Sequence, residues 1–300
     1  MKALVIFHRV DCDGLFGNAI ATRALTEQGY EVEHFGYNYR DDLSLMPELD
    51  QYDRIVLTDI SLDVQSMLNL YYNYKDKVEW IDHHITAIND SFSNGYNDMK
   101  GVRVNGTAAS KLTWQYFFHD EEVPYAVDLV ANYDVWNHDV YDWDNEILAF
   151  QCDLGSEFKM DAQGACDGLD GIINNVMDIQ KIGGCINKYM TDLEKSWCCR
   201  FAFEVAVDGK WHGVAMLSPM FGSTIFQSLA DKNYDCYVVM NKSSKEDGVY
   251  NISMYSDKEG IELNCGEYMK AHFNGGGHKG AAGGTMTAEE FMNVITNYSL

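Results

Sequence analysis

The chain has 300 residues, a length that fits one large domain or two of moderate size, and 46% of them are hydrophobic, which is ample for a buried core. Its 22 Lys and Arg against 46 Asp and Glu give a formal net charge of -24, which would repel a long polyanion. The composition therefore argues against a disordered chain and against a partner such as long duplex nucleic acid.

The eight cysteines show neither a CxxC pair nor a regular spacing, so we expect reduced thiols rather than a disulfide framework or a zinc knuckle. The opening MKALVIF is too short for a secretory apolar segment, and no later stretch is apolar for the length that a bilayer requires. These features predict a cytoplasmic protein with no membrane partner.

The first part of the chain predicts strands alternating with helices. Residues 3–7 form a continuous apolar run, which the polar loop HRVDCDG and a helical pattern over residues 15–29 follow. Further strands are expected at 32–37, 54–60 and 78–81. This alternation predicts parallel strand-helix-strand units, with the carboxyl ends of the strands at one edge of a sheet, where ligands bind.

Acidic and histidine side chains follow three of these strands. They are His8, Asp11 and Asp13 after the first, Asp59 after the third, and Asp82, His83 and His84 after the fourth. Singly, each has an ordinary alternative: Asp11 and Asp59 could cap helices, and Asp13-Gly14 is a common turn. Gathered at one edge, however, such charges would repel one another strongly without cations, so the set predicts a site for divalent metals.

Later segments supply one more acidic group and a second domain. A loop and helix are expected over 106–118, and a helix over 125–133 that delivers Asp134 and Trp136. The Gly- and Asp-rich stretch from about 154 is expected to be irregular, becoming helical over 182–193. Strands at 201–207, 214–217, 237–240 and 250–255, with helices near Phe226, Glu267 and Glu289, predict a smaller α/β unit.

A glycine-rich segment near the carboxyl terminus, GGGHKGAAGG, predicts a cradle for an anion. Glycines such as Gly276 and Gly277 let backbone amides approach a phosphate closely, and His278 and Lys279 can add side-chain donors. The alternative is a flexible glycine loop without a ligand.

Together, HRVDCDG, Asp59, the triplet Asp82-His83-His84 and GGGHKGAAGG resemble the DHH phosphoesterases that carry a DHHA1 domain, the family of RecJ-like exonucleases and nanoRNases. The resemblance spans nearly the whole chain. It implies an α/β fold with a mainly parallel-sheet DHH domain at 1–155, helices on both faces of that sheet, a helical linker at 156–196 and a smaller α/β DHHA1 domain at 197–300.

The resemblance also implies two divalent cations, with manganese as the first expectation and magnesium as the alternative. One cation would be held by His8, Asp11 and Asp59, and the other by Asp13, Asp59, His83 and Asp134. Asp59 would then bridge the pair, and four carboxylates would balance two cations, which lets a phosphate enter despite the acidic chain. Asp139 and His138 compete with Asp134 for the last ligand position.

The remaining roles are likewise implied by the resemblance. Asp59, Asp82 and His84 would be the catalytic residues, with Asp82 orienting a histidine and His84 contacting the substrate phosphate or a metal-bound water. The substrate would also contact residues of both domains, namely Arg103, Gly276, Gly277, His278 and Lys279. Tyr255 stands where several nanoRNase relatives have an arginine, which leaves recognition of the far phosphate open.

The implied reaction is hydrolysis of phosphodiester bonds in short oligonucleotides by a water that the two metals activate. The alternatives are a phosphatase or phosphodiesterase for a discrete nucleotide, such as 3′-phosphoadenosine 5′-phosphate or a cyclic dinucleotide, an inorganic pyrophosphatase, and a non-catalytic nucleotide-binding module. Several members of the family are dimers, so a homodimer is an open expectation.

Overall fold

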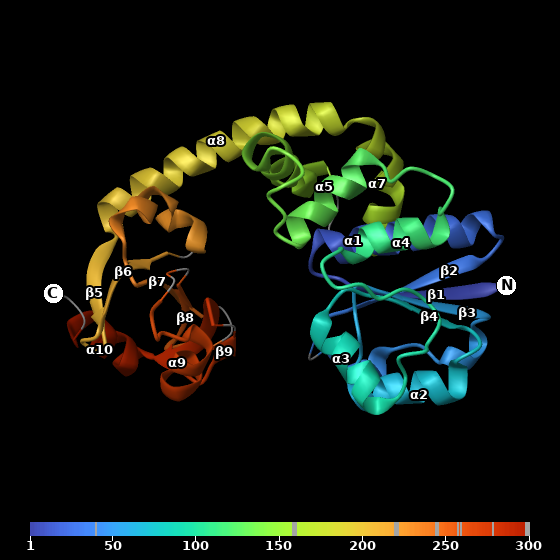
Figure 1. Ribbon diagram of the computed structural model, residues 1–300, viewed down its shortest axis with the longest axis horizontal. Coiled ribbons are helices and arrows are strands. Elements are labelled where there is room, and N and C mark those ends of the chain that lie inside the picture. The colour runs from blue at the N-terminus through green and yellow to red at the C-terminus, as the bar shows by residue number, and fades with distance from the viewer. Residues whose placement is uncertain are drawn as a thin grey trace. The chain divides into compact units, whose positions relative to one another are not determined.

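The structure is a computed structural model that describes residues 1–39, 41–157, 161–218, 222–243, 246–256, 258, 260–277 and 279–297. The chain folds into two compact units, Met1–Asn187 and Lys188–Leu300. The division between them falls within helix α8 (Val176–Phe201), the long helix that joins the two units in Figure 1.

The first unit is built on a four-stranded sheet in which every pair of neighbours is parallel. Its strands are β1 (Lys2–His8), β2 (Glu31–Tyr37), β3 (Arg54–Thr58) and β4 (Val78–Ile81), in the order β2-β1-β3-β4. The predicted parallel sheet is therefore confirmed. The third strand ends at Thr58, before the predicted limit, because Asp59 leaves the extended conformation with a φ of 59°.

Both faces of this sheet are covered by helices, as Figure 1 shows. Along β1, Ala3, Val5 and Phe7 enter one core while Leu4 and Ile6 enter the other, which explains the continuous apolar run. The first core contains residues of α1 (Cys12–Glu27), α4 (Ala109–Phe117), α5 (Tyr125–Asp134) and α7 (Ala162–Asn174). The second contains residues of α2 (Val64–Tyr74) and α3 (Ile85–Asn94).

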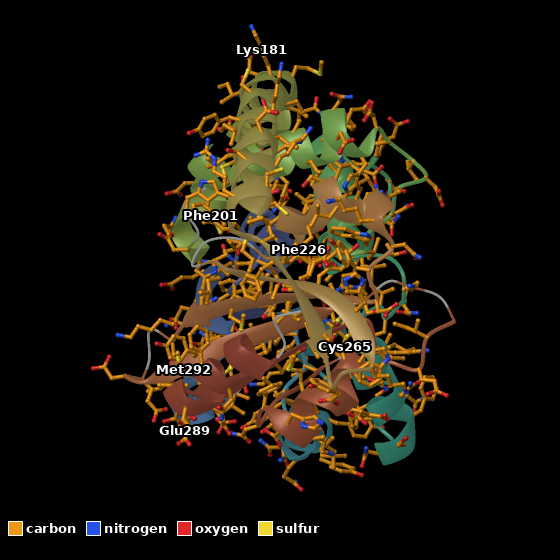
Figure 2. All side chains as sticks on the ribbon, turned by 90° about the vertical axis from the view of Figure 1, so that its left-hand side faces the viewer. Lys181, Phe201, Phe226, Cys265, Glu289 and Met292 are labelled. Carbon is orange, nitrogen blue, oxygen red and sulfur yellow. The ribbon has the colours of Figure 1, made fainter. Side chains whose placement is uncertain are left out.

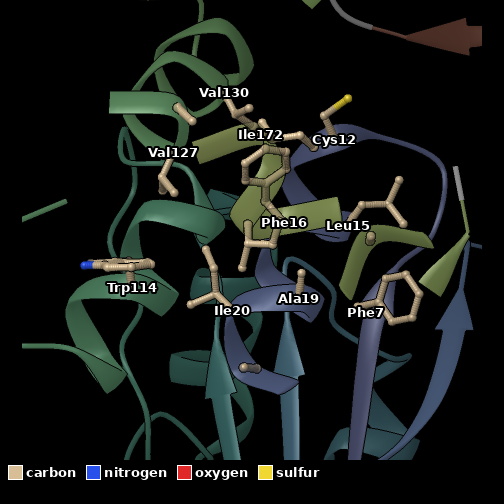
Figure 3. Packing of buried hydrophobic residues seen from close by; sticks show 14 of the residues in the cluster. Phe7, Cys12, Leu15, Phe16, Ala19, Ile20, Trp114, Val127, Val130 and Ile172 are labelled. Carbon is tan, nitrogen blue, oxygen red and sulfur yellow. The ribbon is translucent and has the colours of Figure 1, made fainter. Parts of the chain in front are cut away.

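Helix α1 is pressed closely against the strand ends. Figure 3 shows Phe16 and Ile20 of this helix among Trp114, Val127 and Ile172. A Cβ on Gly14 would lie 2.0 Å from the carbonyl oxygen of His8, and one on Gly17 would lie 2.3 Å from Thr58 Oγ1. The helix can therefore begin directly over β1 and β3, and it starts before the predicted residue 15 because Asp11 caps it.

The prediction of an irregular stretch beginning near residue 154 is wrong for the described residues. They form α6 (Ala149–Glu157), which follows a π-helical turn at Trp143–Leu148, and then α7 and α8. Asp161 starts α7 by accepting a hydrogen bond from the Gly164 amide. Gly183 in α8 meets the backbone of Ala149 so closely that a Cβ would lie 1.7 Å from its carbonyl oxygen. Glycine here permits helix packing rather than ending a helix.

The second unit contains a mixed six-stranded sheet in the order β5-β6-β7-β8-β10-β9, in which only β6 and β7 pair in parallel among the described strands. Its strands are β5 (Phe203–Val207), β6 (Trp211–Leu217), β7 (Cys236–Lys242), β8 (Val249–Tyr255), β9 (Gly276–Gly277) and β10 (Ala281–Thr287). The four predicted strands are confirmed, and β9 and β10 were not predicted.

Each face of this second sheet carries its own core. Along β6, Val214 and Met216 enter the core that contains Phe226, while Ala215 enters the core that contains Cys265; Figure 2 labels both of these residues. The helices are a 3-10 segment at Ser223–Lys232, α9 (Cys265–His272) and α10 (Ala288–Asn297), at the three predicted places. Two short 3-10 turns, Leu43–Leu45 and Leu49–Gln51, connect β2 to β3 in the first unit.

Two further expectations concern thiols and membranes. All eight cysteines lie among the described residues, and none of them forms a disulfide bond. Within the described parts of the chain, none of the helices combines the length and apolarity needed to span a bilayer.

A buried ion pair joins two strands of the first sheet. Glu79 of β4 is 1% exposed and accepts hydrogen bonds from Arg54 Nε at 2.9 Å and Arg54 Nη2 at 2.8 Å, and a third from Lys100 Nζ. Burial disfavours the charged carboxylate, but these donors outweigh burial and lower the pKa of Glu79 below 4.5. The pair therefore ties the edge strand to its neighbour.

We predict opposite effects from two adjacent glycines of α8. Gly183→Ala should lower the free energy of unfolding by about 1–3 kcal/mol, because its methyl group would collide with the Ala149 backbone. Gly184→Ala meets only the Ala149 Cβ at 3.9 Å and should raise stability by up to about 1 kcal/mol through helix propensity. Urea unfolding measures both, and a Gly183 variant as stable as the Gly184 variant would contradict the packing described.

Glu79→Gln should lower the free energy of unfolding of the first unit by about 2 kcal/mol at pH 7. Because the folded pKa of Glu79 is lowered, its stabilising effect is present above pH 4.5 and is lost as the pH falls through the folded value. The difference between the two proteins should therefore be constant from pH 7 to 5 and shrink below pH 4.5. Glu27→Gln, which alters the exposed pair with Arg23, is the control and should cost less than about 0.5 kcal/mol. Equal losses in the two variants would refute the prediction.

Candidate metal centre

The clustered residues lie where the strand order of the first sheet reverses. From β1 the chain runs through α1 to β2 on one side, and it then returns to form β3 on the other side of β1. Such a reversal opens a crevice at the carboxyl edge of a parallel sheet. His8 is the last residue of β1 and Asp59 directly follows β3, so both side chains originate at this point.

Asp59 is the centre of the cluster. It is 1% exposed, and its backbone lies in the left-handed region, which costs energy for any residue other than glycine. Its Oδ1 lies 3.2 Å from His83 Nε2, and its Oδ2 lies 3.5 Å from His8 Nδ1. One carboxylate therefore contacts two imidazoles that are 75 positions apart in sequence, as their numbers 8 and 83 show.

The described residues contain three groups in which potential metal-ligating atoms lie within 4.8 Å of one another. These groups are His8, Asp11 and Asp59; Asp13, His83 and Asp134; and Asp59, His83 and His84. All six residues expected to bind metal are thus brought together. The first group reproduces one expected ligand set, and the second contains the other except for Asp59, whose carboxylate contacts His83.

The ring of His8 is oriented by a residue that sequence reasoning missed. Its Nε2 lies 3.2 Å from Asn38 Oδ1, on the loop after β2, while its Nδ1 is the atom near Asp11 and Asp59. If Nε2 carries the proton and donates it to Asn38, Nδ1 offers its lone pair to the cluster. Because Asn38 follows β2 of the same sheet, its place at the carboxyl end of a strand could have identified it from the sequence.

Asp13 is held by the start of helix α4. Its carboxylate accepts hydrogen bonds from the Ala109 amide at 2.7 Å, from the Ser110 amide at 2.9 Å and from the Ser110 hydroxyl. These donors and the positive end of the helix dipole stabilise a buried negative charge. Asp13 Oδ2 remains 3.8 Å from His83 Nε2 and so still faces the cluster.

Helix α5 delivers the last acidic group. Asp134 is its final residue, and its Oδ2 lies 3.3 Å from His83 Nε2. Of the three candidates in this segment, Asp134 is in a ligand group, whereas His138 stacks on Trp143 and Asp139 is exposed. The geometry favours Asp134.

Asp82 acts as the anchor of the histidine pair. It is fully buried, and its Oδ1 accepts from the His83 amide at 2.7 Å, the His84 amide at 3.1 Å and His84 Nδ1 at 2.8 Å. Its Oδ2 accepts from Trp80 Nε1 at 3.1 Å. The hydrogen bond to Asp82 raises the pKa of His84. Asp82 therefore fixes the ring of His84. The Nδ1 atom makes the hydrogen bond to Asp82, and Nε2 can contact another partner.

The close approach of the groups raises the pKa values of several members of the cluster. Burial, together with the negative charges of Asp59 and Asp134, raises the pKa of Asp13 well above its usual value, and burial with Asp59 raises that of Asp134 to about 6. Burial opposes a charged His8, but its contacts with Asp11 and Asp59 outweigh burial and raise its pKa to about 10. These shifts favour the protonated forms of Asp13, Asp134 and His8.

This donor set fits divalent cations. Among the described residues, His8 Nδ1 and Asp59 Oδ1 are buried and make no hydrogen bond of good geometry, although both lie at ion-pair distance from the other groups. Carboxylate oxygens with imidazole nitrogens are ligands that manganese accepts, and magnesium accepts the carboxylates. Cations held by the separate groups on the two sides of Asp59 would give His8 Nδ1 and Asp59 Oδ1 a partner each.

Arg103 has structural partners rather than an open guanidinium. Its nitrogens donate to the carbonyl oxygens of Trp80 at 2.9 Å and of Met99 at 2.6 Å, with longer contacts to those of Asn97 and Lys100. Through these hydrogen bonds, Arg103 joins the loop after α3 to β4. The structure therefore gives no contact that favours a substrate role for Arg103.

The glycine-rich segment of the second unit forms a hairpin. Gly276 and Gly277 pair with Gly283 and Ala282 of β10, and both are exposed, as is Lys279. His278 lies outside the described residues. Tyr255, at the arginine position of some relatives, is half-buried against the core that contains Phe226. The substrate contacts expected of this segment stay predictions.

A second residue that sequence reasoning missed is Tyr39. Its ring centroid lies 5.8 Å from that of His8 and 6.4 Å, edge-on, from that of His84. Burial, with the charges of Asp82 and Asp59, raises the pKa of its hydroxyl to about 12. An aromatic residue directly after Asn38 gives no chemical signal in the sequence, so only the fold reveals its place.

Comparison with known proteins finds matches among solved structures. No family model matches the sequence, and no curated protein matches it. A pGpG-specific phosphodiesterase from Vibrio cholerae is similar at 14% identity with a TM-score of 0.58, covering 99% of this chain and 97% of that one. The DHH domain of a protein assigned to a ribosomal protein family has a TM-score of 0.59 at 14% identity, covering 98% and 85%.

A third similar structure is an exopolyphosphatase-related protein from Bacteroides fragilis, at 14% identity with a TM-score of 0.50, covering 99% of this chain and 91% of that one. Likeness at this identity establishes the architecture. The fold of this chain is that of the DHH-domain proteins.

Proposed function

We propose that this chain is a metal-dependent phosphoesterase that hydrolyses phosphodiester bonds of short oligonucleotides. The observation that carries the proposal is the position of Asp59, a buried carboxylate whose two oxygens face two separate histidine-aspartate groups. A carboxylate shared in this way is what a pair of divalent cations requires. Asp59 would bridge them, with His8 and Asp11 on one side and Asp13, His83 and Asp134 on the other.

Each residue has a defined task in this proposal. Asn38 and Ser110 hold His8 and Asp13 in place, and Asp82 holds His84 so that its Nε2 can donate a hydrogen bond to a phosphoryl oxygen. The cations would supply positive charge for the phosphate and lower the pKa of water to a useful range. The strand and helix ends supply the rigidity that such a site needs.

Short substrates are favoured over polymers. The net charge of -24 opposes a long polyanion, and the similar protein from Vibrio cholerae is named for pGpG, a linear dinucleotide. The alternatives are a phosphatase or phosphodiesterase for a discrete nucleotide, and a nucleotide-binding module without turnover. The residues of the metal centre are compatible with all three.

The purified chain with manganese, and in parallel with magnesium, should release mononucleotides from a 5′-labelled dinucleotide. A trinucleotide, a cyclic dinucleotide, 3′-phosphoadenosine 5′-phosphate and pyrophosphate complete the panel, with products separated by chromatography. Faster turnover of the cyclic dinucleotide or of the bisphosphate would favour the first alternative. Binding without turnover of any substrate would overturn the enzymatic proposal.

Asp59→Asn should lower metal-dependent turnover at least about 100-fold, because the amide cannot bridge two cations. Asparagine tolerates the left-handed conformation, so the variant should fold. Calorimetric titration with manganese should show a matching loss of affinity. The control is Asp63→Asn at the cap of α2, where asparagine caps equally well and turnover should not change. Normal activity in the Asp59 variant would refute the bridging role.

A further inference from the structure

Four aromatic rings gather at the end of α5 and in the segment that follows it, outside the set of metal-binding groups. Trp136 lies edge-on to Trp143 with ring centroids 4.7 Å apart, and His138 is stacked on Trp143 at 3.8 Å. Tyr133 lies parallel to Trp143 at 6.0 Å. Trp136 is 62% exposed, so most of its indole faces solvent. The metal centre as described gives these rings no task.

The backbone at Trp136 is one that glycine usually occupies. The Asn137 amide donates to the Asn132 carbonyl at 2.9 Å and the Trp136 amide donates to that of Tyr133 at 3.1 Å, which is the hydrogen-bond pattern of a Schellman helix end. Trp136 occupies the left-handed position of this motif, with a φ of 55°. A tryptophan there is strained, and its exposed ring recovers little of that cost by burial.

The same motif fixes Trp136 beside the metal centre. Asp134, two residues earlier, has its Oδ2 3.3 Å from His83 Nε2. Two residues of chain span at most about 7 Å, and the closed helix end leaves this short segment no freedom to swing away. The Cα atoms of Trp136 and Asp134 are therefore at most about 7 Å apart, so the exposed indole begins close to the site at which a phosphate would be bound.

The charges around Trp136 determine which class of ligand its ring can bind. Asp139, Asp142 and Asp144 are exposed in the same segment, so a further phosphate would be repelled there. A neutral planar group would not be repelled, and every nucleobase has a face that stacks on an aromatic ring.

We propose that Trp136, supported by Trp143, is a stacking platform for the nucleobase adjoining the scissile phosphate. The inference rests on the proposed function, since it names how the same site recognises its nucleotide. It also predicts little preference among bases, because stacking does not read hydrogen-bond donors and acceptors.

The test compares a dinucleotide with its abasic counterpart, in which hydrogen replaces the base next to the scissile phosphate. In Trp136→Gly, the ratio of kcat/KM for the base-bearing substrate to that for the abasic one should fall roughly 5- to 150-fold, mainly through KM. Trp136→Phe should restore part of the ratio. Tyr72→Ala removes an exposed aromatic ring of the same unit, 72% exposed on α2, and should leave the ratio unchanged.

The thermal stability of the Trp136→Gly variant shows whether Trp136 recognises the base or only packs against its neighbours. Glycine relieves the left-handed strain, so Trp136→Gly should keep its Tm within about 4 °C of the parent. An unchanged substrate ratio, or a fall in Tm well beyond this range with no change in the ratio, would overturn the proposal and make Trp136 a packing residue.

Binding of adenosine 5′-monophosphate with magnesium distinguishes this proposal from the proposed function. Titration should quench tryptophan fluorescence in the parent, and Trp136→Gly should raise the dissociation constant by the same roughly 5- to 150-fold in equilibrium dialysis. If the parent hydrolyses neither dinucleotide, the proposed function fails while this measurement still decides the stacking. Equal dissociation constants in parent and variant, or no binding by the parent, would refute the platform.

Discussion

The candidate metal centre depends on a buried carboxylate held at the point where the sheet reverses its strand order. Asp59 can be buried only because His8 and His83 lie at its two oxygens, since an isolated charge in such a place would be strongly disfavoured. Burial opposes the charged form of Asp59, yet these contacts outweigh burial and lower its pKa. The position of the Asp59 side chain therefore determines where His8 and His83 must lie.

That arrangement follows from how closely the first helix approaches the sheet. Gly14 and Gly17 let α1 rest on the ends of β1 and β3, which brings Asp11 and Asp13 to the same edge as Asp59. Helix α4 then meets Asp13 through its first amides, and α5 ends at Asp134. Helix ends and backbone amides therefore meet at the cluster, and their contacts offset the electrostatic repulsion between the carboxylates.

Much of this could be predicted from the sequence because strand ends in a parallel sheet share an edge. His8, Asp59 and His83 lie at the ends of short, largely apolar runs, so their convergence required only the correct sheet. The residue pattern did not predict α7 or the first turns of α8, because the Gly- and Asp-rich stretch from about 154 is typical of irregular structure. Strand β10 was missed because its glycines are also typical of a loop; Gly284 sits where a Cβ would lie 2.6 Å from a carbonyl oxygen of Phe273.

Residues that support the site were harder to predict than those that form it. Asn38 acts through the ring of His8, and its only signal in the sequence is its place after a predicted strand. Trp136 was noted only as a neighbour of Asp134, and its residue type does not signal a role without the backbone around it. The central claim concerns Asp59, and crystals grown with manganese would test it most directly by anomalous X-ray diffraction. The account predicts two manganese peaks, each within coordination distance of an Asp59 carboxylate oxygen. Manganese bound elsewhere, or peaks that leave Asp59 without a ligand bond, would contradict it.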